Sequence, residues 1–467
     1  MPVHYKRKSA SEPSCELYFS KKRVESATHS VYSFHRRFVV PEPAGTAAAT
    51  SFRLGVDSAP ESHCLHNTMA IGREAMSVDA ELSQFRMAYA ARLQEFRELV
   101  LSNLVMTAQI PSIAFEENDR AEFVFQRFQE AELLDNDIDG AGNVSATLKS
   151  KNGWRRLLLF AHLDTHFGRS SDHNIAVTQN QVIGPGVAYN SLGVALLITL
   201  PDILTRLNFN LDNTDIVFLA TTKAQGRGDM EGIRSFLKNS RDRVDLAVNL
   251  MGMNLGRLDY FSLSRVRCDI TCQFAEDENT PTMFGERNAI LVMNELVNQL
   301  TAIPLPNNPR TLINYGKFEG GESYSAPSNS ARLSLEIRSE SDEMRSDLEE
   351  RIHNNCMFVG SKFGTEIKAD FFGRQAATQL RFAHPLVQSA YNVLHQLDLQ
   401  PYMAPSNTEI TVLLASQIPA ITLGITKGHN PLTKEASIDI DHIATGLMQI
   451  LMLIYSIDKG YCDEESR

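Results

Sequence analysis

Four residues with the chemistry to bind a metal ion or to move a proton lie close together in the middle of the chain. They are His162, Asp164, His166 and His173, and they follow the apolar run 157–160. A catalytic zinc needs about three imidazole or carboxylate ligands and one open position. The spacing therefore permits a mononuclear site on one loop, although no ligand from a second strand accompanies it. The alternative interpretation is structural: Asp164 holds His162 in place at the end of a strand.

The elements that must position these residues alternate between strand and helix. Strands are predicted at 157–160, 216–220 and 246–250, with helices at 192–204 and 232–237 between them. This alternation is typical of an α/β fold with a mostly parallel sheet flanked by helices. In such folds the chemistry lies at the carboxyl ends of the strands. His162, Ala224 and Met251 follow the three strands, so we expect all three at one edge of the sheet.

The chain is predicted to have three parts. They are a disordered N-terminal extension over 1–80, an α/β domain made of 81–262 and 374–467, and an inserted domain over 263–373. The pattern predicts helices at 80–107 and 440–457 in the α/β domain. In the insert it predicts strands at 267–274, 331–338 and 364–371 and helices at 288–300 and 342–358. This order indicates two helices on one face of an antiparallel sheet.

Charge and composition narrow the choice of partners. The 467 residues carry a net charge of −11, which argues against nucleic acid as the main partner because phosphate binding needs a basic face. The apolar run 447–455 is too short to span a bilayer, which takes roughly 20 residues. The six cysteines are scattered and the N-terminus lacks an apolar signal core. We therefore expect no membrane association, reduced thiols and a cytoplasmic location.

A series of short motifs from about residue 90 to 457 resembles one family in its order and spacing. The family is that of the di-zinc metallopeptidases, which includes aminoacylase, glutamate carboxypeptidase, peptidase T and succinyl-diaminopimelate desuccinylase. The matching segments are Ile110-Pro111-Ser112 with Glu117, Asn143-Val144, the LLLFAHLDTHF run at 157–167, the glycine turn 184–186 with 191–195, 226–234, 284–290 with Glu319-Gly320-Gly321, and 417–421. The resemblance implies a zinc-exopeptidase-like α/β domain with an inserted α+β lid, or dimerisation, domain.

Carried over residue by residue, the resemblance assigns most catalytic roles to residues that cannot perform them. His162 stands at the first metal-ligand position, and Asp164 stands at the position that orients it. The bridging carboxylate falls on Tyr189, and the later carboxylate ligand on Met251. The paired glutamates, one the general base and the other a metal ligand, fall on Ala224 and Gln225. The last His ligand falls on Leu432, with His429 nearby. A thioether suits zinc poorly, and a neutral tyrosine cannot bridge two metal ions as a carboxylate does.

The insert carries the residues that the resemblance assigns to substrate. They are Arg338 in the segment LEIRS, Arg332, Gly320, Gly321, Ser325 at the position of a family asparagine, and Asn279 or Thr280 at the position of a lid histidine. The alternative for Arg338 is a salt bridge with Glu336 or Asp342.

These observations lead to three hypotheses about function. In the first, the protein is a non-catalytic or repurposed homologue without a metal cofactor, which binds a peptide or an N-acyl amino acid and forms a homodimer through the insert. In the second, it is an active amidohydrolase or peptidase. It would then use zinc at a rewired site, or metal-free chemistry from Tyr189, Lys223 and His162. In the third, it is a scaffold that uses the insert edge and the basic N-terminal arm.

Overall fold

The computed structural model describes residues 64–240, 243–274 and 287–464, with side chains from residue 78 onward. Most of the predicted extension over 1–80 and Asn279 in the insert lie outside these ranges. The first helix, α1 (Cys64–Gln94), begins well before the predicted boundary near residue 80. The helix predicted over 80–107 is two helices, because a turn at Glu95 and Phe96 separates α1 from α2 (Arg97–Gln109).

A seven-stranded sheet forms the centre of the α/β domain, in the order β1-β2-β6-β3-β7-β15-β8. The strands are β1 (Leu134–Ile138), β2 (Val144–Leu148), β3 (Arg155–His162), β6 (Thr214–Thr221), β7 (Leu246–Met253), β8 (Leu258–Asp259) and β15 (Ala420–Thr426). The four central strands β6, β3, β7 and β15 are parallel, and the outer pairings are antiparallel. The central strands are buried along nearly their whole length, because helices cover both faces, and this explains their continuous apolar sequences.

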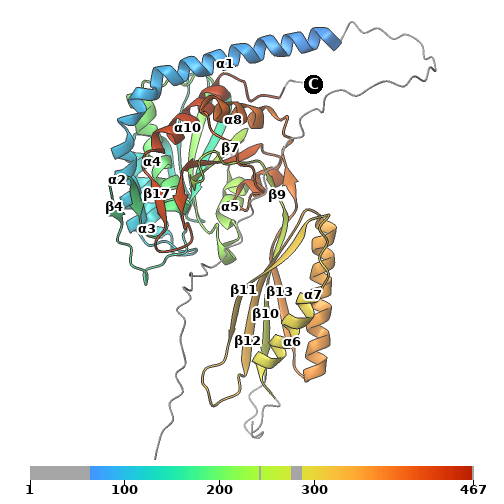
Figure 1. Cartoon of the computed structure of the whole chain (residues 1–467). Coiled ribbons are helices and arrows are strands. Elements are labelled where there is room, and N and C mark those ends of the chain that lie inside the picture. The colour runs from blue at the N-terminus through green and yellow to red at the C-terminus, as the bar shows by residue number, and fades with distance from the viewer. Residues whose placement is uncertain (1–63, 241–242, 275–286, 465–467) are drawn as a thin grey trace, which may run out of the picture. The chain divides into compact units, whose positions relative to one another are not determined.

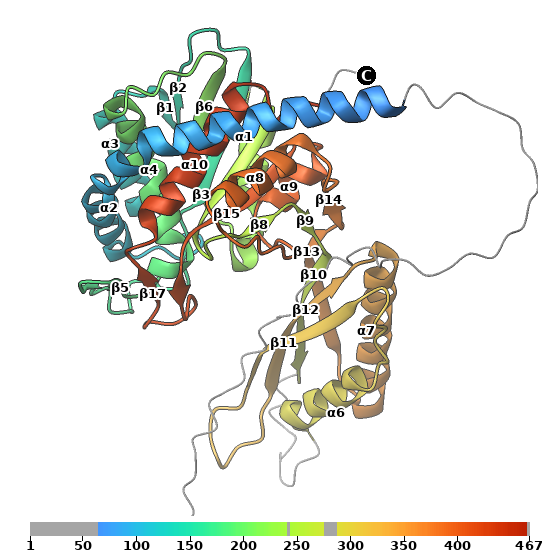
Figure 2. The same cartoon turned by 45° about the horizontal axis from the view of Figure 1, so that its top comes forward.

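One face of the sheet carries the larger core. Its helices are α1, α2, α3 (Asn118–Glu130), α4 (Leu192–Arg206), α8 (Pro385–Gln396) and α10 (Ile443–Asp458). Helix α1 packs along α10, as Figure 2 shows. The other face is covered by α5 (Glu231–Asn239) and the short α9 (Ile410–Ala415). Both layers leave the carboxyl ends of β3, β6 and β7 at one edge, as the sequence predicts. Met251, expected just after the third strand, lies within β7, because this strand continues to Met253.

The insert has its own sheet and its own core. Its four antiparallel strands follow the order β11-β12-β10-β13, with β10 (Ser264–Gln273), β11 (Thr311–Gly320), β12 (Ser330–Ser339) and β13 (Ile367–Gln375). Helices α6 (Ala289–Thr301) and α7 (Asp342–Phe363) pack on one face (Figure 1). The prediction of two helices on one face of an antiparallel sheet is therefore confirmed. Strand β11 was not predicted, because its sequence alternates weakly and most of its residues are exposed.

Two smaller sheets complete the described fold. One joins β4 (Ala176–Val177), β5 (Gln181–Ile183), β16 (Gly428–His429) and β17 (Ser437–Asp439), and the other joins β9 (Phe261–Ser262) to β14 (Thr378–Gln379). Among the described residues, one helical segment, Val187–Arg206, is long and apolar enough to cross a membrane, and 89% of its most apolar window is buried inside the fold.

Candidate functional site

The candidate site lies where β3 and β6 end side by side. His162 is the last residue of β3 and pairs across the sheet with Thr221, the last residue of β6. Asp164 follows His162 in the loop, and it is fully buried. The parallel pairing of the two strands therefore brings two loops together, 163–167 after β3 and 222–230 after β6.

His162 and Asp164 form a buried pair, as the sequence predicts. His162 Nδ1 lies 2.9 Å from the backbone oxygen of Asp164 and 3.2 Å from its Oδ1. Burial alone would lower the pKa of His162, but the hydrogen bond to Asp164 and the charges of Asp164 and Glu409 raise it. Burial alone would raise the pKa of Asp164, but the His162 contact and two backbone N–H groups lower it. Both shifts run in the direction that favours an imidazolium paired with a carboxylate.

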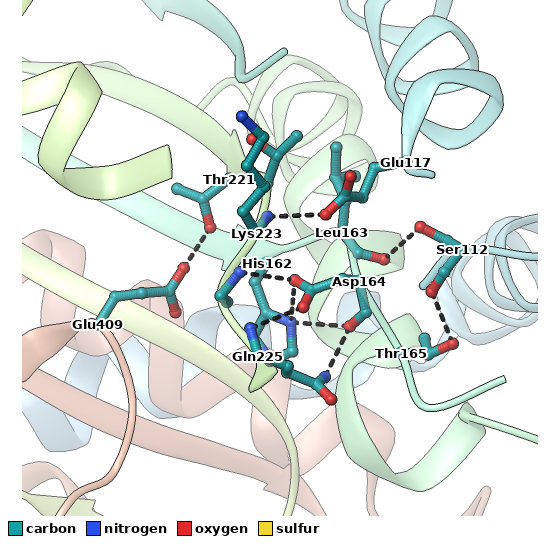
Figure 3. Close-up of polar contacts among 12 residues, drawn as sticks. Ser112, Glu117, His162, Leu163, Asp164, Thr165, Thr221, Lys223, Gln225 and Glu409 are labelled. Atoms are coloured by element: carbon teal, nitrogen blue, oxygen red, sulfur yellow. Dashed lines mark hydrogen bonds and ion pairs between the residues drawn. The ribbon is translucent and has the colours of Figure 1, made fainter. Parts of the chain in front are cut away.

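The loop after β6 closes over Asp164 with the residues that stand in place of the paired glutamates. The backbone N–H groups of Ala224 and Gln225 donate to the Asp164 carboxylate over 3.1 and 2.8 Å. The Gln225 side-chain amide donates to the Asp164 backbone oxygen over 2.9 Å. Figure 3 shows these contacts converging on Asp164. Together with His162 Nδ1, the two backbone N–H groups give the Asp164 carboxylate three donors from within the protein.

Four residues from the recognised motifs hold these loops in place. The Ser112 hydroxyl donates to the backbone of Leu163, and the Thr165 hydroxyl donates to the backbone oxygen of Ser112 (Figure 3). Glu117 accepts the backbone N–H of Lys223 over 2.7 Å, and burial raises the pKa of Glu117. Asn143 accepts the backbone N–H of Thr222 and donates to the backbone of helix α5 at Gly232. Each motif residue thus positions a loop of the site.

Tyr189 lies in the site, at the position that the resemblance gives to a bridging carboxylate. Its ring meets the His162 ring edge-on, with 5.4 Å between centroids, and the exposed His166 packs on it at 5.7 Å. It belongs to the short π-helix Val187–Ser191 that leads into α4. Burial, with the charges of Asp164 and Glu409, raises the pKa of Tyr189 to about 12, so the phenol stays protonated at neutral pH.

Glu409 is a site residue that sequence reasoning missed. It precedes α9, is 1% exposed, and accepts a hydrogen bond from the Thr221 hydroxyl. Figure 3 shows its carboxylate reaching toward the end of β6 beside His162. Burial raises the pKa of Glu409. In the sequence Glu409 is one acidic residue before an apolar run, and nothing local distinguishes it from an exposed helix start.

The residues present do not fit a pair of zinc ions. Of the positions assigned to metal ligands and general base, those at Tyr189, Gln225 and Met251 hold no carboxylate or imidazole, and Ala224 has no polar side chain. Across the described parts of the chain, no three His, Cys, Asp or Glu residues come together in a way that could hold a metal ion. The Asp164 carboxylate is committed to internal donors. No hydrolytic step through a di-zinc centre follows from this set of donors.

Other candidates named from the sequence do not join His162. Both ring nitrogens of His173 contact backbone oxygens, those of Ala108 and Gly168, so the loop cluster does not assemble into a metal site. His429 is exposed on β16. Lys223 turns away to Glu231, 2.7 Å from its carboxylate, and does not complete an acid–base set with Tyr189 and His162.

The residues assigned to substrate in the insert lie at opposite ends of its sheet. Arg338 pairs with Glu336 over 2.6 Å, which is the salt bridge predicted as the alternative. Arg338 lies near the end of β12, where it pairs across the sheet with Arg265 near the start of β10. Gly320 pairs with Ala331 at the other end of β12, and Gly321 and Ser325 are exposed in the connection beyond it. About seven residues of strand separate the two groups, or roughly 23 Å at 3.3 Å per residue, so they do not form one site.

Comparison with known proteins agrees with the motif order. The model of Peptidase family M28 matches residues 143–278, which include β3, β6, β7 and the loops of the site. No protein of curated function matches the sequence significantly.

Solved structures match over most of the chain, at low identity. The di-peptidase Dug1p from Saccharomyces cerevisiae has a TM-score of 0.66 at 11% identity, covering 80% of this chain and 98% of its own. A tripeptidase from Staphylococcus aureus has a TM-score of 0.61 at 16% identity, covering 78% and 99%. The Bacillus subtilis protein YXEP, described as a dinuclear metal binding peptidase from the M20 family, has a TM-score of 0.55 at 13% identity, covering 78% and 99%. The chain therefore has the zinc exopeptidase fold, with the architecture of the M20-type metallopeptidases.

Proposed function

We propose that this protein is a metallopeptidase-like protein that binds a peptide or an N-acyl amino acid and does not hydrolyse it with a di-zinc centre. The observation that carries the proposal is the closed network around Asp164. Three internal donors engage its carboxylate, and two of them come from Ala224 and Gln225, which stand where the family places its paired glutamates.

The chemistry of the site supports binding over hydrolysis. A di-zinc hydrolase needs a carboxylate bridge and a general base close to the attacking water. Tyr189 stays protonated at neutral pH, and Gln225 has no basic group. The peptide part of the proposal rests on the fold, since the similar structures are described as a di-peptidase and a tripeptidase.

Metal content is the direct test of this proposal. The protein is purified without chelator, and zinc is measured by mass spectrometry before and after zinc addition and desalting. We expect less than about 0.1 zinc per chain, because too few ligands are available. A content near two, with hydrolysis of dipeptides or acyl amino acids, would overturn the proposal. A content near one that His162→Ala abolishes would instead support the rewired mononuclear site.

We also propose that the protein forms a homodimer through the insert. Strand β11 is the outer strand of the insert sheet and pairs only with β12 among the described strands, so its other edge is free to pair with a second copy. Phe318 on this strand is 46% exposed. Sedimentation should give the mass of a dimer, and Phe318→Lys should shift it toward the monomer. A wild-type chain of monomer mass at micromolar concentration would exclude the dimer.

A cytoplasmic location is proposed from the thiols. The four cysteines with described side chains, Cys268, Cys272, Cys356 and Cys462, are all free and buried. Free buried thiols are typical of reducing compartments.

A further inference from the structure

Glu409 has a buried carboxylate oxygen that lacks a hydrogen-bond donor. Its Oε1 accepts from Thr221, whereas Oε2 has no partner among the described residues. A buried ionised carboxylate with an unsatisfied oxygen is costly. The oxygen therefore marks a place where a donor from outside the chain would be stabilised.

The other buried atoms without a partner among the described residues include two acceptors, one on β7 and one in the loop after β6. Asn249 is fully buried on β7, where it neighbours Phe160 of β3, and its Oδ1 has no partner although its amide reaches Thr422. Gln225 Oε1 likewise has no partner, while its amide nitrogen is bound to Asp164. A group with several donors and no acceptor complements such atoms, and an ammonium group has three donors and no acceptor.

The charge at the site favours a cationic group. The negative charge of Asp164 is offset by direct contacts with His162 and two backbone N–H groups. Glu409 forms no ion pair among the described residues: it accepts a hydrogen bond from the neutral Thr221 hydroxyl, and the charge of His162 acts on it without direct contact. The Tyr189 ring lies in the same site beside His162, and aromatic rings attract ammonium groups. A metal cation fits less well, since no three suitable ligands converge among the described residues.

We infer that the site binds the free amino terminus of a peptide, with Glu409 as the counter-ion of its ammonium group. The inference rests on the proposed binding function and narrows it. Peptides and N-acyl amino acids, the two proposed ligand classes, differ at the amino group. A peptide carries an ammonium there, and an N-acyl amino acid carries an uncharged amide. An acylated ligand would leave Glu409 buried and unpaired, so the site selects against it.

The test compares two matched series of compounds on the full-length protein. A complete set of dipeptides and the same dipeptides with acetylated amino termini are screened by thermal shift, and the binders are measured by calorimetry. We expect binding from the free series, and at least tenfold weaker binding after acetylation. The Glu409→Gln protein, which keeps the shape and the acceptor for Thr221, should bind the same dipeptide at least tenfold more weakly. Glu122→Gln removes one charge from an exposed position on α3 and should bind like the wild type.

The outcomes separate this inference from the function on which it rests. Acetylated dipeptides that bind as tightly as the free ones, or a Glu409→Gln protein with unchanged affinity, would overturn the ammonium site and leave the binding function intact. No binding from either series would overturn both. Melting curves of the two variants show whether a loss of affinity reflects a loss of folding.

Discussion

The strand-end site and the open face of the insert sheet are both rich in charge, yet they use it differently. On the insert, the face not covered by α6 and α7 pairs the buried Asp269 and the half-buried Glu336 with several donors each. Asp269 accepts from Arg332, Ser334 and Arg227, and Glu336 accepts from Arg267 and Arg338. At the strand ends, Asp164 similarly has a full set of donors, but one oxygen of Glu409 has no partner in the part of the chain that the structure describes.

This difference separates charges that hold the fold from a charge available for a ligand. A carboxylate with a full set of internal donors gains nothing further from a ligand, and its removal weakens the fold. A buried carboxylate with unused acceptor capacity costs stability in the free protein, and this cost is recovered on binding. The directions of the pKa shifts agree, because the pKa of Asp269 and Asp164 is lowered while that of Glu409 is raised.

The largest expected effect on the free energy of unfolding comes from Asp164, whose carboxylate has a full set of donors. Asp164→Ala removes the partner of His162 and of two backbone N–H groups, so we expect a loss of about 3–5 kcal/mol in the free energy of unfolding. Because the pKa of Asp164 is lowered in the folded state, its stabilisation is complete above about pH 4 and is lost as the pH falls through the folded pKa. Urea unfolding at pH 7 and at pH 3 measures both effects.

The control for this variant is Asp119→Ala. Asp119 pairs with Arg169 over 2.7 Å at an exposed position, and its loss should cost less than about 1 kcal/mol. Equal losses for the two variants would mean that the buried network around Asp164 contributes no more than a surface ion pair.

The second-largest expected effect is a gain in the free energy of unfolding, not a loss. Glu409→Gln replaces a buried, incompletely paired carboxylate with a neutral amide, so we expect a gain of about 1–3 kcal/mol at pH 7. The pKa of Glu409 is raised in the folded state, so its contribution to stability is full below the unfolded pKa and is lost as the pH rises through the folded pKa. The gain from the substitution should therefore shrink toward pH 4. A destabilised Glu409→Gln protein at pH 7 would show that the carboxylate is satisfied without a ligand.

The sequence predicts much of the fold because the signals are local. The strand at 157–160 is an uninterrupted apolar run, and it extends in the structure to Arg155–His162. The His162–Asp164 contact follows from a separation of two residues at a strand end. The salt bridge between Arg338 and Glu336 is likewise a contact between residues two apart on one strand.

The unpredicted parts depend on contacts between distant segments. Glu409 meets Thr221 across 188 positions, and no period or motif encodes that meeting. The Gln225 side chain reaches Asp164 across 61 positions. The separation between the insert residues assigned to substrate was unpredicted for a related reason. Motif order does not show that Gly320 and Arg338 lie at opposite ends of paired strands.

The smallest expected effect tests the insert side of the comparison. Arg332→Gln removes one of three side-chain partners of Asp269 and leaves the contacts with Ser334 and Arg227. Arg332 is 44% exposed in its side chain, so we expect a loss of only about 0.5–1 kcal/mol, which 1 M salt should largely remove by screening. Urea unfolding at low and high salt measures it. A loss above about 2 kcal/mol that persists in salt would mean that Asp269 depends on Arg332 alone. The insert face would then be no more redundantly paired than the strand-end site, and the contrast between the two regions would fail.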